Sequence, residues 1–338
     1  MDFKDFFAGK DDENRRLDRV IRIFSPDLSI SEIYKAIRKK LIRVNDKKTE
    51  ESYHVQINDK ISMASFLVKS EKKSEYKNKS NINPELPPIV FKNNNVIIFN
   101  KPANIAVHGN NSLEKQVRLY FNSSNKKTES LSFRPGPLHR IDRNTSGLVA
   151  FSWSIEGARW FTEHIQDHSI QKYYYGIVQG NLKSQEKWKD YIKKTDEPGK
   201  ASAFKTVEFI KGDSDFKNSD FSDEKAAETD VTPLSWGKLK LEKKEIEITL
   251  VKFKIYTGRQ HQIRSQSKGH NHPLIGDTAY GGIDLSDTEY HSKNFFLHAA
   301  ELHIPENPVN LPAVIKAPLP EKFIDFLSKT CDITNLNI

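Results

Sequence analysis

The sequence predicts an α+β protein in which a large domain with a largely antiparallel sheet follows a small unit of helices and short strands. Short apolar runs separated by turns recur from residue 89 toward the C-terminus, as expected for the strands of such a sheet. The first 80 residues, after a tail over residues 1–15, contain helical patterns with basic outer faces. Between the two, residues 69–88 are polar and end in prolines, which indicates a linker.

The N-terminal unit contains clear helix signals. One short helix is expected around residues 17–24. A second begins at Ser29, which precedes Glu32 with the spacing of a capping box, and continues with apolar residues at helical intervals. The segments LIRVNDKK and YHVQINDKI then predict short strands joined by Asn-Asp turns. The basic residues around these two helices include Arg16, Arg19, Lys35, Arg38 and Lys39.

The large domain is expected over residues 89–330. Its strand-like runs include KYYYGIVQG and LEKKEIEITLVKFKIY, and helices are expected near residues 156–166 and in the C-terminal tail. Residues 211–230 contain three Lys against seven Asp and Glu. Such a segment predicts an acidic surface loop that points away from a polyanionic ligand.

The composition favours an anionic partner. The chain has 53 Lys and Arg against 45 Asp and Glu, a formal net charge of +8, and nucleic acid is the partner that this balance favours. The single cysteine, Cys331, excludes an intrachain disulfide and a zinc site built on several thiolates. The N-terminus lacks the apolar stretch of a signal peptide, and no run has the length of a membrane span. We therefore expect a cytoplasmic protein that does not enter membranes.

Four segments of the large domain carry unusual polar content beside expected strands: NKPANIAVH, LHRIDRNTSG, KYYYGIVQG and TGRQHQIRSQSKGHNHPLIGDTAYGG. The last is rich in glycine, histidine and arginine, a composition suited to bringing the backbone close to a bulky ligand. Its histidines leave a metal site open as an alternative. However, neither the HExxH pattern nor an acid and histidine pair at helical ligand spacing is present, so we expect no metal.

Asp142 is the single carboxylate in residues 138–147, a segment that also holds two arginines. Arginines favour the charged form of a carboxylate, which leaves four roles open: nucleophile, charge stabiliser, base, or structural partner of an arginine. Glycoside hydrolysis by paired carboxylates would need a second acid, and none is close in sequence. A serine triad of Ser146, His139 and Asp142 lacks the Gly-x-Ser-x-Gly elbow.

The four segments, in this order, resemble the motifs of the RluA-type family of pseudouridine synthases. LHRIDRNTSG is similar to the family's signature loop, His-Arg-Leu-Asp followed by two variable residues and Thr-Ser-Gly. NKPANIAVH is similar to its Lys-Pro-x-Gly loop, KYYYGIVQG to its Lys-x-Tyr strand, and TGRQHQIR to its Thr-Gly-Arg-x-His-Gln-Ile-Arg segment. The likeness covers about residues 89–328. Residues 16–68, with their RLDRVI opening, resemble the alpha-L RNA-binding module first known from a ribosomal small-subunit protein.

The resemblance implies a pseudouridine synthase fold with a small α/β RNA-binding module, and an enzyme that isomerises uridine in large-subunit ribosomal RNA without metal or cofactor. Asp142 matches the catalytic aspartate, and Arg264 the arginine that pairs with it. Tyr174 matches the tyrosine that stacks on the target base and is a candidate acceptor of the carbon-5 proton. The expected RNA-binding residues are Lys101, His139, Arg140, Arg259, His261 and Gln262, together with Arg16, Arg19, Lys35, Arg38 and Lys39 of the module.

Two other functions are alternatives. A non-catalytic RNA-binding or ribosome-assembly factor could use the same fold, but a retired enzyme would be free to lose Asp142, Tyr174 and Arg264, which are all present. A metal-dependent nuclease would need clustered carboxylates, which the sequence lacks. Nothing in the sequence requires an oligomer, so a monomer is expected.

Overall fold

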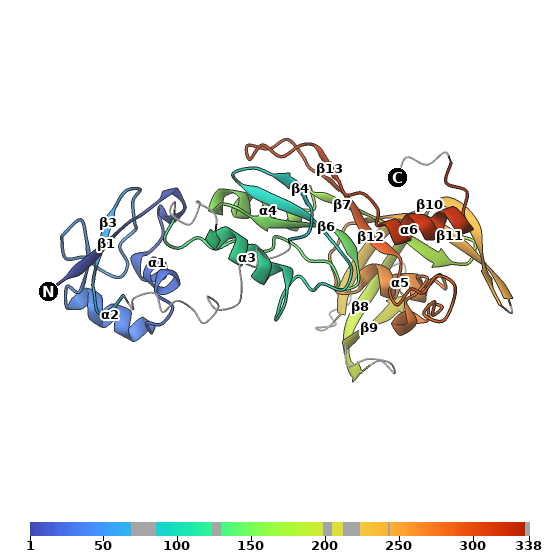
Figure 1. The fold of residues 1–338 in the computed structure, drawn as a ribbon, viewed down its shortest axis with the longest axis horizontal. Coiled ribbons are helices and arrows are strands. Elements are labelled where there is room, and N and C mark those ends of the chain that lie inside the picture. Colours follow the sequence, from blue (N-terminus) through green and yellow to red (C-terminus); the bar gives the residue numbers. More distant parts are fainter. Residues whose placement is uncertain (69–85, 124–129, 199–204, 212–223, 243, 335–338) are drawn as a thin grey trace.

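The computed structural model describes residues 1–68, 86–123, 130–198, 205–211, 224–242 and 244–334. It has the predicted α+β class: a small N-terminal lobe carries a three-stranded sheet and two helices, and a larger lobe is built on a ten-stranded sheet. The small lobe lies at one end of an elongated molecule (Figure 1). None of the helices in these ranges is both long enough and apolar enough to cross a membrane.

The N-terminal lobe, residues 1–68, is called the module below. Its helices are α1 (Leu17–Phe24) and α2 (Ile30–Arg38), and its sheet has the order β1 (Phe3–Phe7), β3 (Lys60–Ala64), β2 (Ile42–Val44). The buried residues of both helices share one apolar core with β2 and β3, which is why the helical intervals in the sequence were informative. The predicted capping box of α2 is confirmed, since Ser29 Oγ accepts from Glu32 N and the Glu32 carboxylate accepts from Ser29 N.

Two details of the module differ from expectation. The predicted tail over residues 1–15 is wrong, because Phe3–Phe7 form β1, which pairs antiparallel with β3, and a 3-10 helix, η1 (Lys10–Asp12), follows. The strand predicted in residues 53–61 begins only at Lys60. The preceding residues instead form turns around Asp59, whose carboxylate accepts from Gln56 N.

Asp12, the last residue of η1, joins the module to the large domain. Its side chain is fully buried and accepts hydrogen bonds from Gly9 N, Ser130 Oγ, Leu131 N, Ser132 N and Ser132 Oγ. Buried carboxylates are stable when such donors surround them.

Two neighbours of Asp12 extend this contact. Asp11 accepts from Ile155 N at the start of α4, and Arg15 Nη1 donates to Ser132 Oγ at 2.8 Å. We call the contact of residues 9–15 with residues 130–132 and 155 the seam. It fixes the module against the large domain through segments more than 100 residues apart in the chain.

The large sheet has the strand order β4-β5-β6-β12-β7-β11-β10-β8-β9, with β13 paired to β12. The predicted, largely antiparallel character is confirmed: among the described strand pairs of this sheet, β6 and β12 are parallel and the others are antiparallel. The strands are β4 (Ile89–Lys92), β5 (Val96–Lys101), β6 (Ser146–Ser152), β7 (Gln171–Gln179), β8 (Glu186–Pro198), β9 (Lys205–Lys211), β10 (Glu224–Leu241), β11 (Lys244–Ile255), β12 (Leu297–His303) and β13 (Val314–Lys316).

The helices of the large domain were predicted in part. α4 (Ile155–Gln166) and the C-terminal α6 (Glu321–Thr330) lie where the apolar spacing placed them. α3 (Leu113–Ser123), α5 (Gln262–Gly269) and the 3-10 helix η4 (Thr278–Tyr280) were not predicted. α5 gives no amphipathic signal, because it buries polar side chains, Ser265, Gln266 and Ser267, against β8 and β10.

The prediction of a loop over residues 211–230 is wrong at both ends, and Lys211 is the last residue of β9. Residues 224–230 are the start of β10 and pair with β8. A charge count over a window cannot locate the residue at which a strand begins, and here the window included one end of a central strand. Residues 212–223, like residues 69–85 of the predicted linker, lie outside the described residues.

Candidate active site

A cavity of about 830 Å³ opens on one face of the large sheet, between the loop before β6, strand β7 and the segment that leads into α5. We call it the pocket. It brings together eight of the predicted site residues, namely His139, Arg140, Asp142, Tyr174, Arg259, His261, Gln262 and Arg264. No group of three or more His, Cys, Asp or Glu side chains in the described parts of the chain lies close enough to hold one metal ion.

The Asp142 loop rests on a buried lysine. Lys101 Nζ donates to Pro102 O at 2.8 Å and to Arg143 O at 3.1 Å, and Arg143 Nε in turn donates to Asn104 O at 3.0 Å. Burial lowers the pKa of Lys101 to about 7, an effect that the charge of Asp142 opposes. Lys101 is fully buried and does not line the pocket, so its side chain supports the loop from inside the protein.

The backbone conformation at Gly147 explains why a glycine stands at the end of the Asp142 loop. Its φ of +112° lies in the region that favours glycine, and a Cβ there would collide with the backbone of Ala299. The absence of a side chain therefore lets β6 approach β12. This parallel pair anchors the loop on the central strands of the sheet.

Arg264 is held by Asp277 and reaches Asp142. Its Nε and Nη2 donate to the two carboxylate oxygens of Asp277 at 2.7 and 2.8 Å, while its Nη1 lies 3.5 Å from Asp142 Oδ2. Its guanidinium also lies over the rings of Tyr280 and Phe295. Burial alone would lower the pKa of Arg264, but the hydrogen bonds and charge of Asp277, then the charge of Asp142, raise it. Arg264 is thus a fixed cation directed at Asp142.

His261 lies on the other side of Asp142. It precedes α5 in a left-handed conformation (φ 53°), its Nδ1 is 2.8 Å from Tyr280 Oη, and its Nε2 is 4.0 Å from Asp142 Oδ1. Burial lowers the pKa of His261, and the charge of Asp142 acts in the opposite direction. The His261 ring is therefore mainly neutral at pH 7. At 4.0 Å it is not a close partner of Asp142 Oδ1, which has none among these groups.

Tyr174 forms part of the pocket wall from β7. It is 7% exposed and stands opposite Phe253 of β11 and Ala299 of β12. Burial, then the negative charge of Asp142, raises the pKa of its hydroxyl, which is therefore protonated at neutral pH. An aromatic face with a protonated hydroxyl is suited to stacking on a flat ring.

Gln262 supports the site from behind. Its buried amide donates to Glu228 O and Thr229 Oγ1 and accepts from Thr257 Oγ1 and Arg259 N. Its polar atoms are thus engaged within the protein, and the side chain ties the loop before α5 to β10. This is the strand whose first residues had been assigned to the acidic loop.

Two of the expected RNA-binding residues in the signature loop differ in exposure. Arg140 is exposed at the mouth of the pocket. His139 turns inward, where its ring stacks on Phe161 and its Nε2 accepts from Ala150 N at 3.1 Å. Burial, then the charge of Lys172, lowers the pKa of His139 to about 3, so it is neutral.

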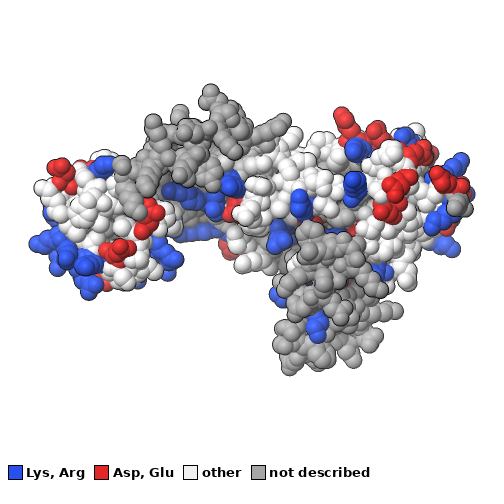
Figure 2. Space-filling model, turned by 60° about the horizontal axis from the view of Figure 1, so that its bottom comes forward, with Lys and Arg blue, Asp and Glu red and all other residues white. Residues whose placement is uncertain are grey.

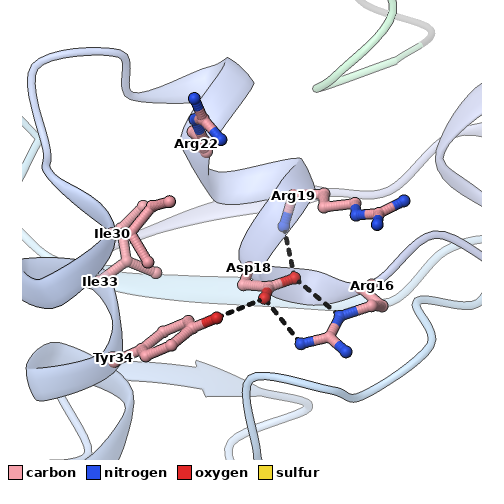
Figure 3. Close-up of a pocket in the computed structure, with 7 residues that line it drawn as sticks. All are labelled: Arg16, Asp18, Arg19, Arg22, Ile30, Ile33 and Tyr34. Atoms are coloured by element: carbon pink, nitrogen blue, oxygen red, sulfur yellow. Dashed lines mark hydrogen bonds and ion pairs between the residues drawn. The ribbon is translucent and has the colours of Figure 1, made fainter.

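The basic residues of the module gather away from the pocket. Arg19, Lys35, Arg38 and Lys39 are exposed, and Lys and Arg side chains cluster on the module in Figure 2. Arg16 is different, because Asp18 accepts two hydrogen bonds from its guanidinium and raises its pKa. This pair lines a cavity of about 250 Å³, and Tyr34 donates to the same carboxylate (Figure 3).

Three residues of the site were not singled out from the sequence. Asp277 orients Arg264, and Lys172 and Lys225 line the pocket. Asp277 lies within HPLIGDTAYGG and Lys172 opens the Lys-x-Tyr pattern, so both were inside quoted motifs without an assigned role. A non-local ion pair has no local sequence signal, which is why the partner of Arg264 could be found only in the fold.

Comparisons with known proteins agree with this architecture. Residues 95–268 match the family described as RNA pseudouridylate synthase, and residues 15–61 match the S4 domain. The proteins named ribosomal large subunit pseudouridine synthase C from Buchnera aphidicola subsp. Acyrthosiphon pisum and subsp. Schizaphis graminum are 27% and 28% identical, and each alignment covers 95% of this chain and 96% of the relative.

A solved structure supports the fold. Human RNA Pseudouridylate Synthase Domain Containing 1 superposes with a TM-score of 0.53 at 23% identity, over 74% of this chain and 89% of that one. The family match itself spans more than half of the 338 residues and includes Asp142, Tyr174 and Arg264. The chain therefore belongs to the RNA pseudouridylate synthase family, isomerases that convert uridine to pseudouridine in RNA.

Proposed function

We propose that this protein isomerises uridine to pseudouridine in large-subunit ribosomal RNA, with Asp142 as the single catalytic carboxylate. The observation that carries the proposal is the composition of the pocket wall. Among the described residues that line the pocket, Asp142 is the only Asp or Glu. Asp277, directly behind, has both carboxylate oxygens engaged by Arg264.

The reaction suits one carboxylate. The bond between ribose carbon 1′ and uracil nitrogen 1 breaks, the base rotates, carbon 1′ bonds to carbon 5, the carbon-5 proton leaves, and nitrogen 1 takes up a proton. Every heavy atom is retained, so no second acid is needed to activate water. Asp142 attacks or stabilises the fragment that carries positive character while the base and the sugar are apart. Arg264 orients the Asp142 carboxylate.

Tyr174 is assigned to stacking on the uracil ring. Its raised pKa leaves little phenolate at neutral pH, so the structure favours stacking over proton abstraction for this residue. The apolar side chains Ile141, Ile263 and Leu297 line the same pocket and limit the water around the separated base. The cavity falls in the range of roughly 300–1,000 Å³ that is usual for ligand sites.

A uridine in structured RNA must leave its stack to reach Asp142, at a cost of a few kcal/mol. Arg140, two residues before the aspartate and exposed at the mouth, is assigned to the gap that the base leaves. The exposed basic side chains of the module add phosphate contacts that carry no base specificity.

The substrate class rests on two supports. The relatives that align with nearly the whole chain are named for the large ribosomal subunit, and the module matches an S4 domain. We also infer that the protein acts as a monomer in the cytoplasm. The residues that we assign to the reaction all lie in one chain, and a single cysteine suits a reducing compartment.

The test is tritium release from RNA labelled at carbon 5 of uridine. Large-subunit ribosomal RNA should release tritium, whereas small-subunit ribosomal RNA and transfer RNA should release little. Release from transfer RNA alone would show that the substrate is transfer RNA and not large-subunit ribosomal RNA. Tight binding without release from any of the three would favour a non-catalytic assembly factor.

A further inference from the structure

Lys172 of β7 is a buried cation with no counter-charge among the described residues. Its residue is 8% exposed, it lines the pocket, and its Nζ lies 3.6 Å from the point where a Cβ of Gly258 would stand. The Lys172 side chain has no hydrogen bond or ion pair with any described residue, whereas its backbone pairs with β11 and β12. Burial lowers its pKa. An ammonium in this position destabilises the fold unless a bound group supplies an acceptor or a counter-charge.

Lys101 shows how the same protein treats a buried lysine that serves the fold. Lys101 is buried more completely, yet its Nζ donates to the carbonyls of Pro102 and Arg143. Lys172 has no such acceptors among the described residues, although the nearby loops contain carbonyl groups. The difference indicates that the acceptor for Lys172 comes with the substrate.

His139 adds a second unused donor on this side of the pocket. Its Nε2 accepts from Ala150 N, so in the neutral ring the proton is on Nδ1. That buried Nδ1 has no hydrogen-bond partner among the described residues. The positive charge of Lys172 lowers the pKa of His139, which places the two groups within electrostatic range. These two side chains therefore bring a positive charge and a buried donor, and no acceptor, to this part of the wall.

We propose that Lys172 binds a phosphate that flanks the target uridine while its base stacks on Tyr174, an inference that rests on the proposed function. Alternate residues of a strand face the same side and lie about 6.6 Å apart, because each residue rises about 3.3 Å. This spacing is similar to the span from a base to a phosphate of its own nucleotide. A uracil carbonyl would accept a hydrogen bond but would leave the charge of Lys172 uncompensated. A phosphate accepts the hydrogen bond and also compensates the charge.

The test compares Lys172→Met with Lys172→Arg by binding to large-subunit ribosomal RNA at several salt concentrations. Loss of one phosphate contact should reduce the slope of log Kd against log salt by about 0.7–0.9. We expect that reduction in Lys172→Met, with kcat/KM lowered about tenfold or more, and an unchanged slope in Lys172→Arg. Lys254→Met is the matched control, since Lys254 lies on the opposite face of the sheet and should leave the slope unchanged.

A stability measurement separates this role from a structural one. Removal of an unpaired buried charge should raise the Tm of Lys172→Met by roughly 2–4 °C. An unchanged salt slope in Lys172→Met would overturn the proposal. A lower Tm together with that unchanged slope would assign Lys172 a structural role instead. The slope needs no turnover. If the unmodified protein released no tritium, the proposed function would fail while the binding data still decided the role of Lys172.

Discussion

Asp12 in the seam and Asp142 in the pocket are aspartates in opposite surroundings. Asp12 is fully buried and accepts five hydrogen bonds from residues 9 and 130–132. The Asp142 side chain is 18% exposed, and the nearest atoms of His261 and Arg264 are 4.0 and 3.5 Å away. A carboxylate whose acceptor positions are occupied fixes backbone in place, whereas one with free positions in a cavity can receive a substrate.

The same difference separates Lys101 from Lys172, and Asp277 from Asp142. Lys101 and Asp277 are saturated by partners within the protein, while Lys172 and Asp142 face the pocket with few or distant partners. Residue type therefore does not mark function in this chain. The unused hydrogen-bonding capacity of a buried or half-buried charge is the more informative property.

Arg264→Met should give the largest effect, because Arg264 serves a saturated and an unsaturated aspartate at once. The buried carboxylate of Asp277 would lose both of its hydrogen bonds from Arg264, so the free energy of unfolding should fall by about 3–5 kcal/mol in urea titrations. Tritium release should fall below detection. The double variant Arg264→Met/Asp277→Leu should regain stability without regaining turnover. Recovered turnover would mean that Arg264 acts only on Asp277.

Asp12→Ala tests the seam side of the comparison. Its loss leaves the donors of residues 130–132 without their acceptor, and the free energy of unfolding should fall by about 2–3 kcal/mol. The kcat at saturating RNA should change less than twofold, because the pocket is untouched. Asp325→Ala, at an exposed position of α6, is the matched control and should change stability by less than about 0.5 kcal/mol. A kcat loss in Asp12→Ala would break the distinction between the two aspartates.

The module can be tested without cutting the seam. Deletion of the N-terminal residues would remove Asp11 and Asp12 and so disturb α4 and residues 130–132. Replacing Lys35, Arg38 and Lys39 together with Ala avoids this problem. The RNA concentration at half-maximal rate should rise about tenfold, and the salt slope of binding should fall by roughly 2–3. A reduced kcat at saturating RNA would show that the module also contributes to the chemical step.

Arg140→Ala should give the smallest effect, since Arg140 touches the reaction only through the cost of unstacking. Tritium release from a structured RNA should fall about tenfold and from an unfolded RNA less than twofold, given an unstacking cost of a few kcal/mol. Arg140→Lys, which keeps the charge but not the planar group, should resemble Arg140→Ala. Equal losses on both RNAs would assign Arg140 to binding alone.

The sequence predicted the parts of this protein that are local or carried by motifs. The capping box at Ser29, helix α4 and the antiparallel sheet follow from spacing, and the motifs placed Asp142, Tyr174 and Arg264 on one pocket. The seam could not be predicted, because Asp12 lies in a charged run that resembles a solvated tail and its partners lie 118–120 residues away.

Burial was the other property that the sequence did not reveal. Lys101 and Gln262 match the family motifs, yet their polar atoms bind carbonyls and hydroxyls inside the protein. Motif membership identifies a position that matters without telling whether the side chain faces substrate or scaffold. Only the fold distinguishes Lys101 below the loop from Lys172 in the pocket.

The most direct test of Asp142 as the single catalytic carboxylate compares tritium release by Asp142→Asn and by the unmodified protein. The substrate is large-subunit ribosomal RNA labelled at carbon 5 of uridine. The substitution keeps the shape of the side chain and removes its charge. We expect release by the unmodified protein and a loss on the order of 10³-fold or more in Asp142→Asn, with RNA binding and Tm retained. Release by Asp142→Asn at a comparable rate would contradict the assignment of Asp142 as the single catalytic carboxylate.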